Sequence, residues 1–449
     1  MPRARSIATV LTAAALVRVA VPLIALAVAR PEPQFREPDS GGYLQAAEQL
    51  LETGRLGTCD EPEIKRTPGY PLLLVPGLAV GHVEMVTVAL QIALACATVW
   101  LVYQTATLVY QRDDIALAAA WLCACEPVSM IYASKLLSET LFTTLLTAAL
   151  WFITRYCAWQ RWRDVLLAAA VVAAATYVRP ITYFLPVCLA PALLVALGRR
   201  DGRAWRRTAQ AVAFFALSVW LMAFWQVRNW SEARYTGFAA IADVNLYYYE
   251  ALPVVAERDG IPPSQWDKFQ VAAGESNPAA YLQRHPEQRD WPVAERYAFL
   301  RREAWRIIRG DPWRWARLHF GGVAHTLGDS GRNAWVAFFR LADTSKDVAV
   351  KPGTLIDRFV TALKQRPLVL VIHGLLATTL LVYLGLASVG LVAVPARTPA
   401  LLLLLAVGAY LLLLSGGAAG YHRFRLPLVP LISLLAGAGW CWMVARCRR

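Results

Sequence analysis

Long apolar runs are the feature that most constrains the fold of this 449-residue chain. A helix that spans a bilayer needs about 20 mainly apolar residues. Only 17% of the residues are charged, against roughly 25% in an ordinary soluble domain. The sequence therefore predicts an all-α polytopic membrane protein with about ten transmembrane helices, within a range of about 8 to 13. The predicted spans are Ile7–Ala29, His82–Val109, Ile115–Ala133, Thr140–Ile153, Val165–Tyr177, Ile181–Leu197, Ala209–Val227, Leu368–Val394, Ala400–Ser415 and Leu426–Val444.

The basic residues indicate which ends of these spans share one side of the membrane. The formal net charge is +14, yet only six of the 45 basic residues are lysines, and many arginines border apolar runs. This pattern favours membrane orientation over nucleic-acid binding. Placing Arg3 and Arg5 in the cytoplasm puts every short basic loop there, so we expect both termini to be cytoplasmic. Abundant Ala, Leu and Arg with few Lys is typical of a GC-rich bacterium, and we expect the inner membrane.

Two long segments then fall on the opposite, outer side, at about residues 30–81 and 228–367. We expect three regions: an N-terminal transmembrane catalytic module over residues 1–227 that includes the first outer loop 30–81, the large outer loop 228–367, and C-terminal transmembrane helices over residues 368–449. The large loop alternates aromatic and basic residues, for example over Trp313–Phe320. That alternation predicts helices on the membrane surface, with arginines at lipid phosphates.

The first outer loop places a carboxylate near two cations. Ser40 can cap a helix whose apolar residues recur at helical spacing, and Gly54 suits the end of that helix. Asp39 then lies at a fixed position beside the start of the helix, and Lys65 and Arg66 follow in the same loop. Two interpretations remain open: Asp39 and Ser40 only cap the helix, or Asp39 is a base beside a phosphate site.

The order of these residues resembles the glycosyltransferase-C superfamily, in particular bacterial relatives of protein O-mannosyltransferases and aminoarabinose transferases. The similar features are an Asp in the first outer loop, a helix that ends in Gly, and a basic residue before a Pro-Gly-Tyr-Pro-Leu-Leu segment. Further similar stretches follow in the same order and cover almost the whole chain: Ser134–Phe142, Tyr177–Pro180, Phe224–Trp230 and Gly420–Pro430.

The resemblance implies a membrane glycosyltransferase that moves a sugar from a polyprenyl-phosphate donor to a glycan, lipid or protein acceptor on the outer face. An inverting transfer needs one carboxylate to accept the proton of the acceptor, and Asp39 is the candidate general base. No nucleic-acid partner is expected. The sequence requires no cofactor and shows no zinc motif, although a divalent metal on Asp39 and a second carboxylate is left open. The candidate substrate-binding residues are Lys65, Arg66, Tyr70, Glu139, Arg179, Arg228, Asn229, Arg423 and Arg425.

Several of these residues also have structural interpretations. Lys135 and Glu139, one helical turn apart, can form an ion pair with each other or contact the substrate. Arg228 and Asn229 can bind the sugar or end a helix, and the four basic residues at positions 65, 66, 423 and 425 can anchor lipid headgroups. A polytopic transporter or lipid flippase is the alternative function, but its ionisable sites are expected near the bilayer midplane. A scaffold without enzymatic activity is a third class.

Overall fold

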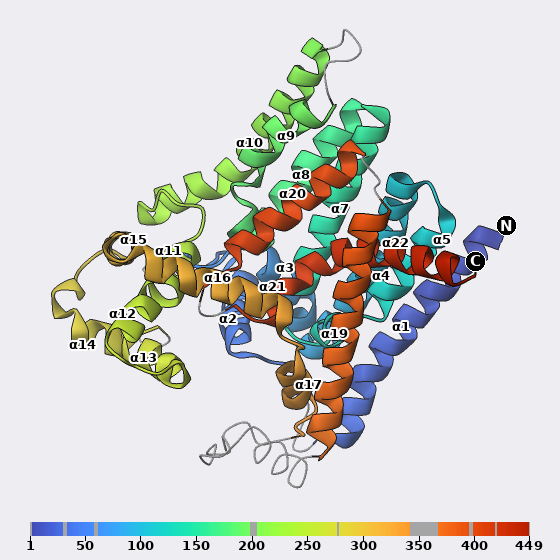
Figure 1. Ribbon diagram of the computed structural model, residues 1–449. Coiled ribbons are helices and arrows are strands. Elements are labelled where there is room, and N and C mark those ends of the chain that lie inside the picture. Colours follow the sequence, from blue (N-terminus) through green and yellow to red (C-terminus); the bar gives the residue numbers. More distant parts are fainter. Residues whose placement is uncertain are drawn as a thin grey trace.

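The computed structural model of the chain describes residues 2–29, 34–57, 62–197, 204–275, 278–341, 367–394, 398–417 and 420–448. Within these ranges the chain is helical, and the one β-bridge there joins Gly57 to Pro62. Figure 1 shows long helices packed side by side, with a group of shorter helices beyond one end of the bundle. The predicted all-α class is confirmed.

Six helices in the described part of the chain are long and apolar enough to cross a membrane. Shorter apolar helices pack among them, so the protein is multi-pass as predicted, but the expected number of about ten spans is not confirmed. The six long helices are α1 (Pro2–Val28), α4 (Val83–Tyr110), α7 (Glu139–Trp159), α10 (Ala204–Ala233), α19 (Pro367–Ala393) and α22 (Val429–Cys447), the last extended by the turn from His422. The shorter ones are α3 (Gly69–Ala79), α8 (Trp162–Val178), α9 (Leu185–Leu197) and α20 (Pro399–Leu414).

The predicted span Ile115–Ala133 is wrong as a single helix. The chain forms α5 (Asp113–Ala124), breaks, and starts again as α6 (Pro127–Tyr132). Pro127 lacks a backbone N–H and disfavours a helical residue before it, which explains the break. The carbonyl of Ala124, freed at the end of α5, accepts a hydrogen bond of 2.9 Å from Arg18 of α1. Arg18 is 1% exposed. This intramembrane arginine therefore supplies the hydrogen bond that the Ala124 carbonyl loses where the helix breaks.

Two further predicted spans have different limits in the structure. The segment Ile181–Leu197 begins with a 3₁₀ turn, Pro180–Thr182, and becomes helical only at Leu185 in α9. The segment Thr140–Ile153 lies inside the longer helix α7 and is therefore too short as predicted. Helix α7 ends where Gln160 adopts the left-handed conformation, with φ of 49°.

The tight turns of the bundle gather at one end, called here the turn side. The C-terminal part of α7 and the first turns of α10 meet there, because Tyr156 Oη donates to Gln210 Oε1 at 3.0 Å and Gln210 Nε2 donates to the Gln160 carbonyl at 3.1 Å. The two chain ends also lie close together in Figure 1. The expected grouping of all short basic loops on one side stays a prediction, because residues 198–203 and 395–397 lie outside the described ranges.

The opposite end of the bundle, called here the loop side, carries the remaining helices. Helix α2 (Pro38–Thr53) and the four-residue helix α21 (His422–Arg425) lie at this end of the bundle. The shorter helices within residues 241–328, called here the loop-side subdomain, extend beyond them (Figure 1). Its apolar core includes Tyr248, Leu252 and Leu300. The helices from the end of α10 to α19 are α11 (Ile241–Asn245), a π-helical turn (Leu246–Ala251), α12 (Leu252–Arg258), α13 (Trp266–Ala272), α14 (Pro278–Arg284), α15 (Val293–Gly310), α16 (Pro312–Gly328) and α17 (Arg332–Phe338).

Glycines let α19 and α22 approach at the backbone. A Cβ added at Gly390 would lie 1.9 Å from the Leu435 carbonyl oxygen, and one at Gly439 would lie 2.0 Å from the Leu386 carbonyl oxygen. Small residues at a helix crossing permit such close packing within a membrane. Helix α19 therefore depends on these two positions for its contact with α22.

We predict that Gly390→Ala lowers the thermal stability of the detergent-solubilised protein, because the added methyl forces α19 away from α22 at a cost of about 1–3 kcal/mol. Gly385→Ala on the same helix is the matched control, since a Cβ there meets no atom within 4 Å. Melting temperatures of both variants test the prediction, and equal values would contradict it.

Candidate active site

Asp39 lies in the first turn of α2, on the loop side of the bundle. The residue that precedes this helix is Glu37, so the expected N-cap at Ser40 is wrong. Ser40 instead sits three residues further on, where its Oγ accepts from the Glu37 backbone N–H at 2.8 Å and donates to the Leu136 carbonyl at 2.8 Å. Gly54 ends the helix with φ of 71°, as predicted. Ser40 thus ties the start of α2 to the α6–α7 junction.

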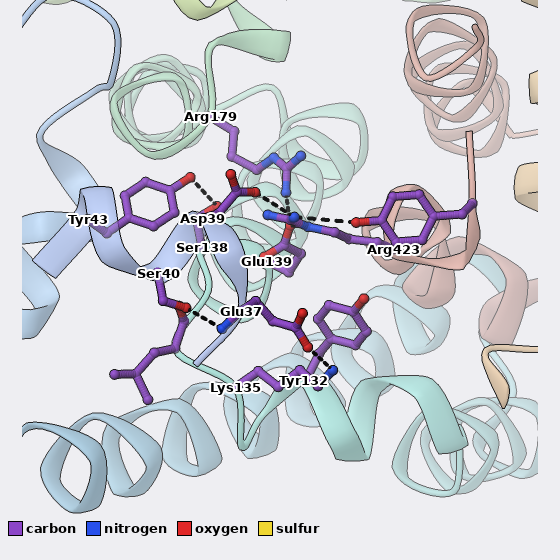
Figure 2. A network of polar contacts seen from close by, with 12 residues as sticks. Glu37, Asp39, Ser40, Tyr43, Tyr132, Lys135, Ser138, Glu139, Arg179 and Arg423 are labelled. Atoms are coloured by element: carbon purple, nitrogen blue, oxygen red, sulfur yellow. Dashed lines mark hydrogen bonds and ion pairs between the residues drawn. The ribbon is translucent and has the colours of Figure 1, made fainter. Parts of the chain in front are cut away.

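Arg423 joins Asp39 to a second carboxylate. Its Nη1 donates to Asp39 Oδ2 at 2.7 Å, and its Nε donates to Glu139 Oε1. Arg179, the residue that ends α8, donates to the same Glu139 oxygen. Figure 2 shows these side chains converging from α2, α7, α8 and α21. The structure therefore brings together four of the predicted site residues.

Arg66 completes the group from the other side of Asp39. Its Nη1 donates to the Asp39 backbone carbonyl at 2.6 Å, and its Nη2 lies 3.9 Å from Asp39 Oδ1. The guanidinium is 4.5 Å from the centroid of the Tyr43 ring, within the range of a cation–π contact. A Cβ at residue 42 would lie 2.5 Å from the Arg66 guanidinium carbon, which explains Gly42. We call Asp39, Arg66, Glu139, Arg179 and Arg423 the Asp39 cluster.

The two carboxylates of the Asp39 cluster differ in their access to solvent. The Asp39 side chain is 47% exposed, whereas the Glu139 side chain is 1% exposed. Partial burial acts to raise the pKa of Asp39, but the charges of Arg423 and Arg66 outweigh this effect and lower that pKa. Asp39 is thus an ionised, accessible carboxylate, and Glu139 is an enclosed one that holds two arginines.

Lys65 lies beside the Asp39 cluster but has no ion-pair partner among the described residues. Its backbone carbonyl accepts a 3.0 Å hydrogen bond from the Ile241 N–H, and the Ile64 carbonyl accepts one of 2.8 Å from Ala240. Burial and the nearby charge of Arg66 lower the pKa of the Lys65 ammonium, and Glu275 opposes the shift. The loop-side subdomain thus fixes the backbone that carries both Lys65 and Arg66.

Of the two interpretations of Lys135 and Glu139, the ion pair between them is wrong. Lys135 instead donates to Glu37, the residue before α2, while Glu139 contacts the two arginines. Lys135 precedes the first turn of α7 and is not part of that helix, so the i, i+4 spacing does not bring it to Glu139. The Glu37 contact joins chain segments 98 residues apart.

Four other predicted site residues, Tyr70, Arg228, Asn229 and Arg425, form hydrogen bonds with partners outside the Asp39 cluster. Tyr70 is fully buried, stacks edge-on against Tyr43, and donates to Gln91 Oε1 at 3.1 Å. Arg228 donates to the carbonyls of Glu63 and Leu56 at 2.6 Å each. Asn229 donates to the Phe238 carbonyl at 2.9 Å, and Arg425 donates to three carbonyls of residues 326–329. These four side chains therefore have structural partners.

Sequence reasoning missed several residues around the site. Tyr43 is not among the predicted site residues, yet its ring contacts the Arg66 guanidinium. Asp329 and His422 form a close pair directly beside Arg423, with 2.6 Å between Oδ2 and Nδ1. The one available signal was that His422 precedes Arg423 in the sequence. No spacing pattern connects Asp329 with it, because the two lie 93 residues apart.

A metal centre has no preassembled ligand set in the described ranges. No three His, Cys, Asp or Glu side chains gather there as they would around a metal ion. The two carboxylates of the Asp39 cluster both contact Arg423, which occupies the position between them. The present side-chain arrangement therefore fits an arginine bridge between the carboxylates.

Comparisons with known proteins show what this chain is similar to. The sequence model of the dolichyl-phosphate-mannose-protein mannosyltransferase family matches residues 65–230, less than half of the chain. The match includes Lys65, Arg66, Glu139 and Arg179, while Asp39 lies outside it. No curated protein matches the sequence.

Solved structures show which fold the chain shares. The archaeal oligosaccharyltransferase AglB from Archaeoglobus fulgidus, in complex with an inhibitory peptide and a dolichol-phosphate, aligns over 98% of this chain and 50% of its own, with a TM-score of 0.54 and 10% identity. The same enzyme tethered to an acceptor peptide gives a TM-score of 0.54, 11% identity and coverages of 98% and 50%. This chain thus spans about half the length of the archaeal enzyme.

ArnT from Cupriavidus metallidurans, bound to undecaprenyl phosphate, aligns over 95% of this chain and 77% of its own. Its identity is 16% and its TM-score is 0.39. The family match and the shared archaeal fold confirm the resemblance to the glycosyltransferase-C superfamily that the sequence indicated.

The contact between Glu37 and Lys135 gives a prediction about stability. The Lys135 side chain is 2% exposed and that of Glu37 is 21% exposed. Glu37→Met leaves a buried ammonium without its partner, which costs about 3–5 kcal/mol. Lys135→Met leaves a more accessible carboxylate, so we expect a smaller decrease in melting temperature. The double variant should recover part of the loss, and equal losses in both single variants would contradict this account.

Proposed function

We propose that the protein is an integral membrane glycosyltransferase that moves a sugar from a polyprenyl-phosphate donor to an acceptor with inversion at the anomeric carbon. The observation that carries this proposal is the exposed Asp39 carboxylate, which lies between Arg423 and Arg66 on the loop side of the bundle. The match to the mannosyltransferase family and the fold of the archaeal oligosaccharyltransferase support it.

Asp39 is the general base in this mechanism. An oxygen of the acceptor attacks the anomeric carbon, the bond from that carbon to the phosphate oxygen breaks, and the acceptor proton passes to the Asp39 carboxylate. The lowered pKa keeps this carboxylate ionised at neutral pH. Glu139 is unsuited to the same role, because its side chain is almost fully enclosed and contacts two arginines.

The cations beside Asp39 suit the leaving group. A phosphodiester becomes a phosphate monoester in this reaction, and fixed positive charges stabilise the negative charge that develops. Arg66 is 3.9 Å from the Asp39 carboxylate oxygen, a long separation for an ion pair, so its guanidinium can engage a phosphate. Lys65, without a partner among the residues described, is the second candidate.

The location of the Asp39 cluster favours an enzyme over a transporter or flippase. Its charged groups lie at the ends of α7 and α8 and on α2 and α21 rather than in the middle of the spans. The buried Arg18 within α1 donates through its two Nη groups to carbonyls of α5 and to Ser129, which gives it a structural role. We further propose that the acceptor is a glycan, lipid or protein, and that the loop side faces away from the cytoplasm.

We predict that Asp39→Asn reduces turnover by about 10² to 10⁴ with little loss of folding, because the amide keeps the size of the side chain but cannot accept the proton. The measurement is transfer of labelled sugar from polyprenyl phosphate by the purified protein, with its melting temperature. Asp267→Asn is the matched control, since Asp267 is an exposed residue in the first turn of α13. Near-native turnover of Asp39→Asn would refute the assigned base.

The orientation of the protein gives a separate prediction. In a variant whose native cysteines are replaced, a membrane-impermeant thiol reagent added to intact cells should label a cysteine at Asp259 on the loop side. It should not label one at Arg163, an exposed residue on the turn side. The positive-inside rule gives the direction. The reverse labelling would place the Asp39 cluster on the cytoplasmic face.

A further inference from the structure

His422 is a buried residue that the proposed chemistry does not use, although it directly precedes Arg423. The residue is 4% exposed. Its Nδ1 lies 2.6 Å from Asp329 Oδ2, and its Nε2 lies 3.2 Å from the Tyr132 hydroxyl. The His422 backbone N–H also donates to Asp329 Oδ2 at 3.2 Å. Both ring nitrogens and the backbone of this residue are therefore fixed.

The end of α16 holds the whole turn that carries His422. Arg425 donates to the carbonyls of Thr326, Leu327 and Asp329 at 2.9, 3.1 and 2.8 Å. The Asp329 carboxylate is itself held by the Gly331 N–H at 3.0 Å. One side of the α21 turn, with His422 and Arg425, thus contacts the end of α16, while Arg423 contacts Asp39 and Glu139.

Tyr132 connects His422 with the start of α7. Its backbone carbonyl accepts from Thr140 Oγ1 at 3.1 Å, and Thr140 is the residue after Glu139. His422 therefore contacts Asp329 near the end of α16 on one side and the α6–α7 segment on the other. Arg423 lies between His422 and Arg425 in the chain, and its side chain contacts Asp39 and Glu139.

We propose that His422 and Asp329 are positioning residues for the transfer reaction, and that they act by holding Arg423 against Asp39 and Glu139. The proposal rests on the proposed function, since it assigns a role within the same site. His422 touches neither of the two carboxylates in the contacts described, so its effect on them passes through Arg423.

The first test measures the Asp39 carboxylate without any sugar donor. A water-soluble carbodiimide with an amine nucleophile converts accessible carboxyl groups to amides, and mass spectrometry of the peptides gives the rate at each residue. We expect His422→Ala to raise the labelling rate of Asp39 several-fold, because loss of the Arg423 contact leaves this carboxyl unshielded and more readily protonated. Asp267 in the same digest is the internal reference.

Matched variants separate positioning from a general loss of structure. Asp329→Asn removes the charge beside His422 with little change in shape and should also raise Asp39 labelling. His422→Asn keeps a donor toward Asp329 and should stay closer to the native rate than His422→Ala. His285→Asn is the control, since His285 also lies near a carboxylate, 3.4 Å from Glu287, but in the loop-side subdomain. Native labelling of Asp39 in both folded His422→Ala and Asp329→Asn would overturn the proposal.

The second test is a double-variant cycle on sugar transfer. If His422 acts through Arg423, His422→Ala should reduce kcat about tenfold in the native background but leave it within about twofold in the Arg423→Gln background. Equal losses in both backgrounds would overturn the positioning role. Absence of transfer by the native protein with polyprenyl-phosphate donors would refute the proposed function, and the labelling rates would still decide whether His422 holds Arg423.

Discussion

The contact of one guanidinium with two carboxylates is the interaction on which the rest of the site depends. Arg423 approaches from the last turn of the loop side, Asp39 from the first, and Glu139 from the start of a long central helix. The three residues lie far apart in the chain, so no local rule of helix formation brings them together. Arginine suits this position because its planar group donates in several directions at once. Arg423 thereby joins α2, α7 and α21 on the loop side of the bundle.

A broken helix precedes the segment that carries Lys135 and Glu139. The chain ends α5 at Ala124 and starts again as α6, which ends at Tyr132, shortly before α7. The break exposes carbonyls that the bilayer cannot satisfy. Arg18 satisfies them from α1, with hydrogen bonds to Ala124 and Cys123 of α5. Arg18, an ionisable residue within a span, thus has a structural role.

The sequence predicted most of what hydropathy and local spacing determine, and less of what long-range contact determines. Hydropathy predicts the long apolar helices, and Gly54 predicts the end of α2. Ionisable residues at the ends of spans predict that Glu139, Arg179 and Arg423 belong to the same site as Asp39. The ion pair between Lys135 and Glu139, one of two interpretations of their spacing, does not form, because Glu37, 98 residues away, is the partner of Lys135. Asp329 was missed for the same reason: its partner is distant in the chain and carries no motif.

The charge balance of the site gives a physical reason for the proposed chemistry. Asp39 and Glu139 contribute two negative charges, which Arg423 and Arg179 offset through direct contacts. Arg66 and Lys65 add positive charge beside Asp39, and the charges of Glu275 and Glu63 act on Lys65. In the proposed reaction a phosphodiester becomes a monoester and gains a second negative charge, which nearby cations stabilise. Arg66 and Lys65 therefore suit the leaving group of the proposed reaction, and the Asp39 carboxylate suits the proton that the acceptor must lose.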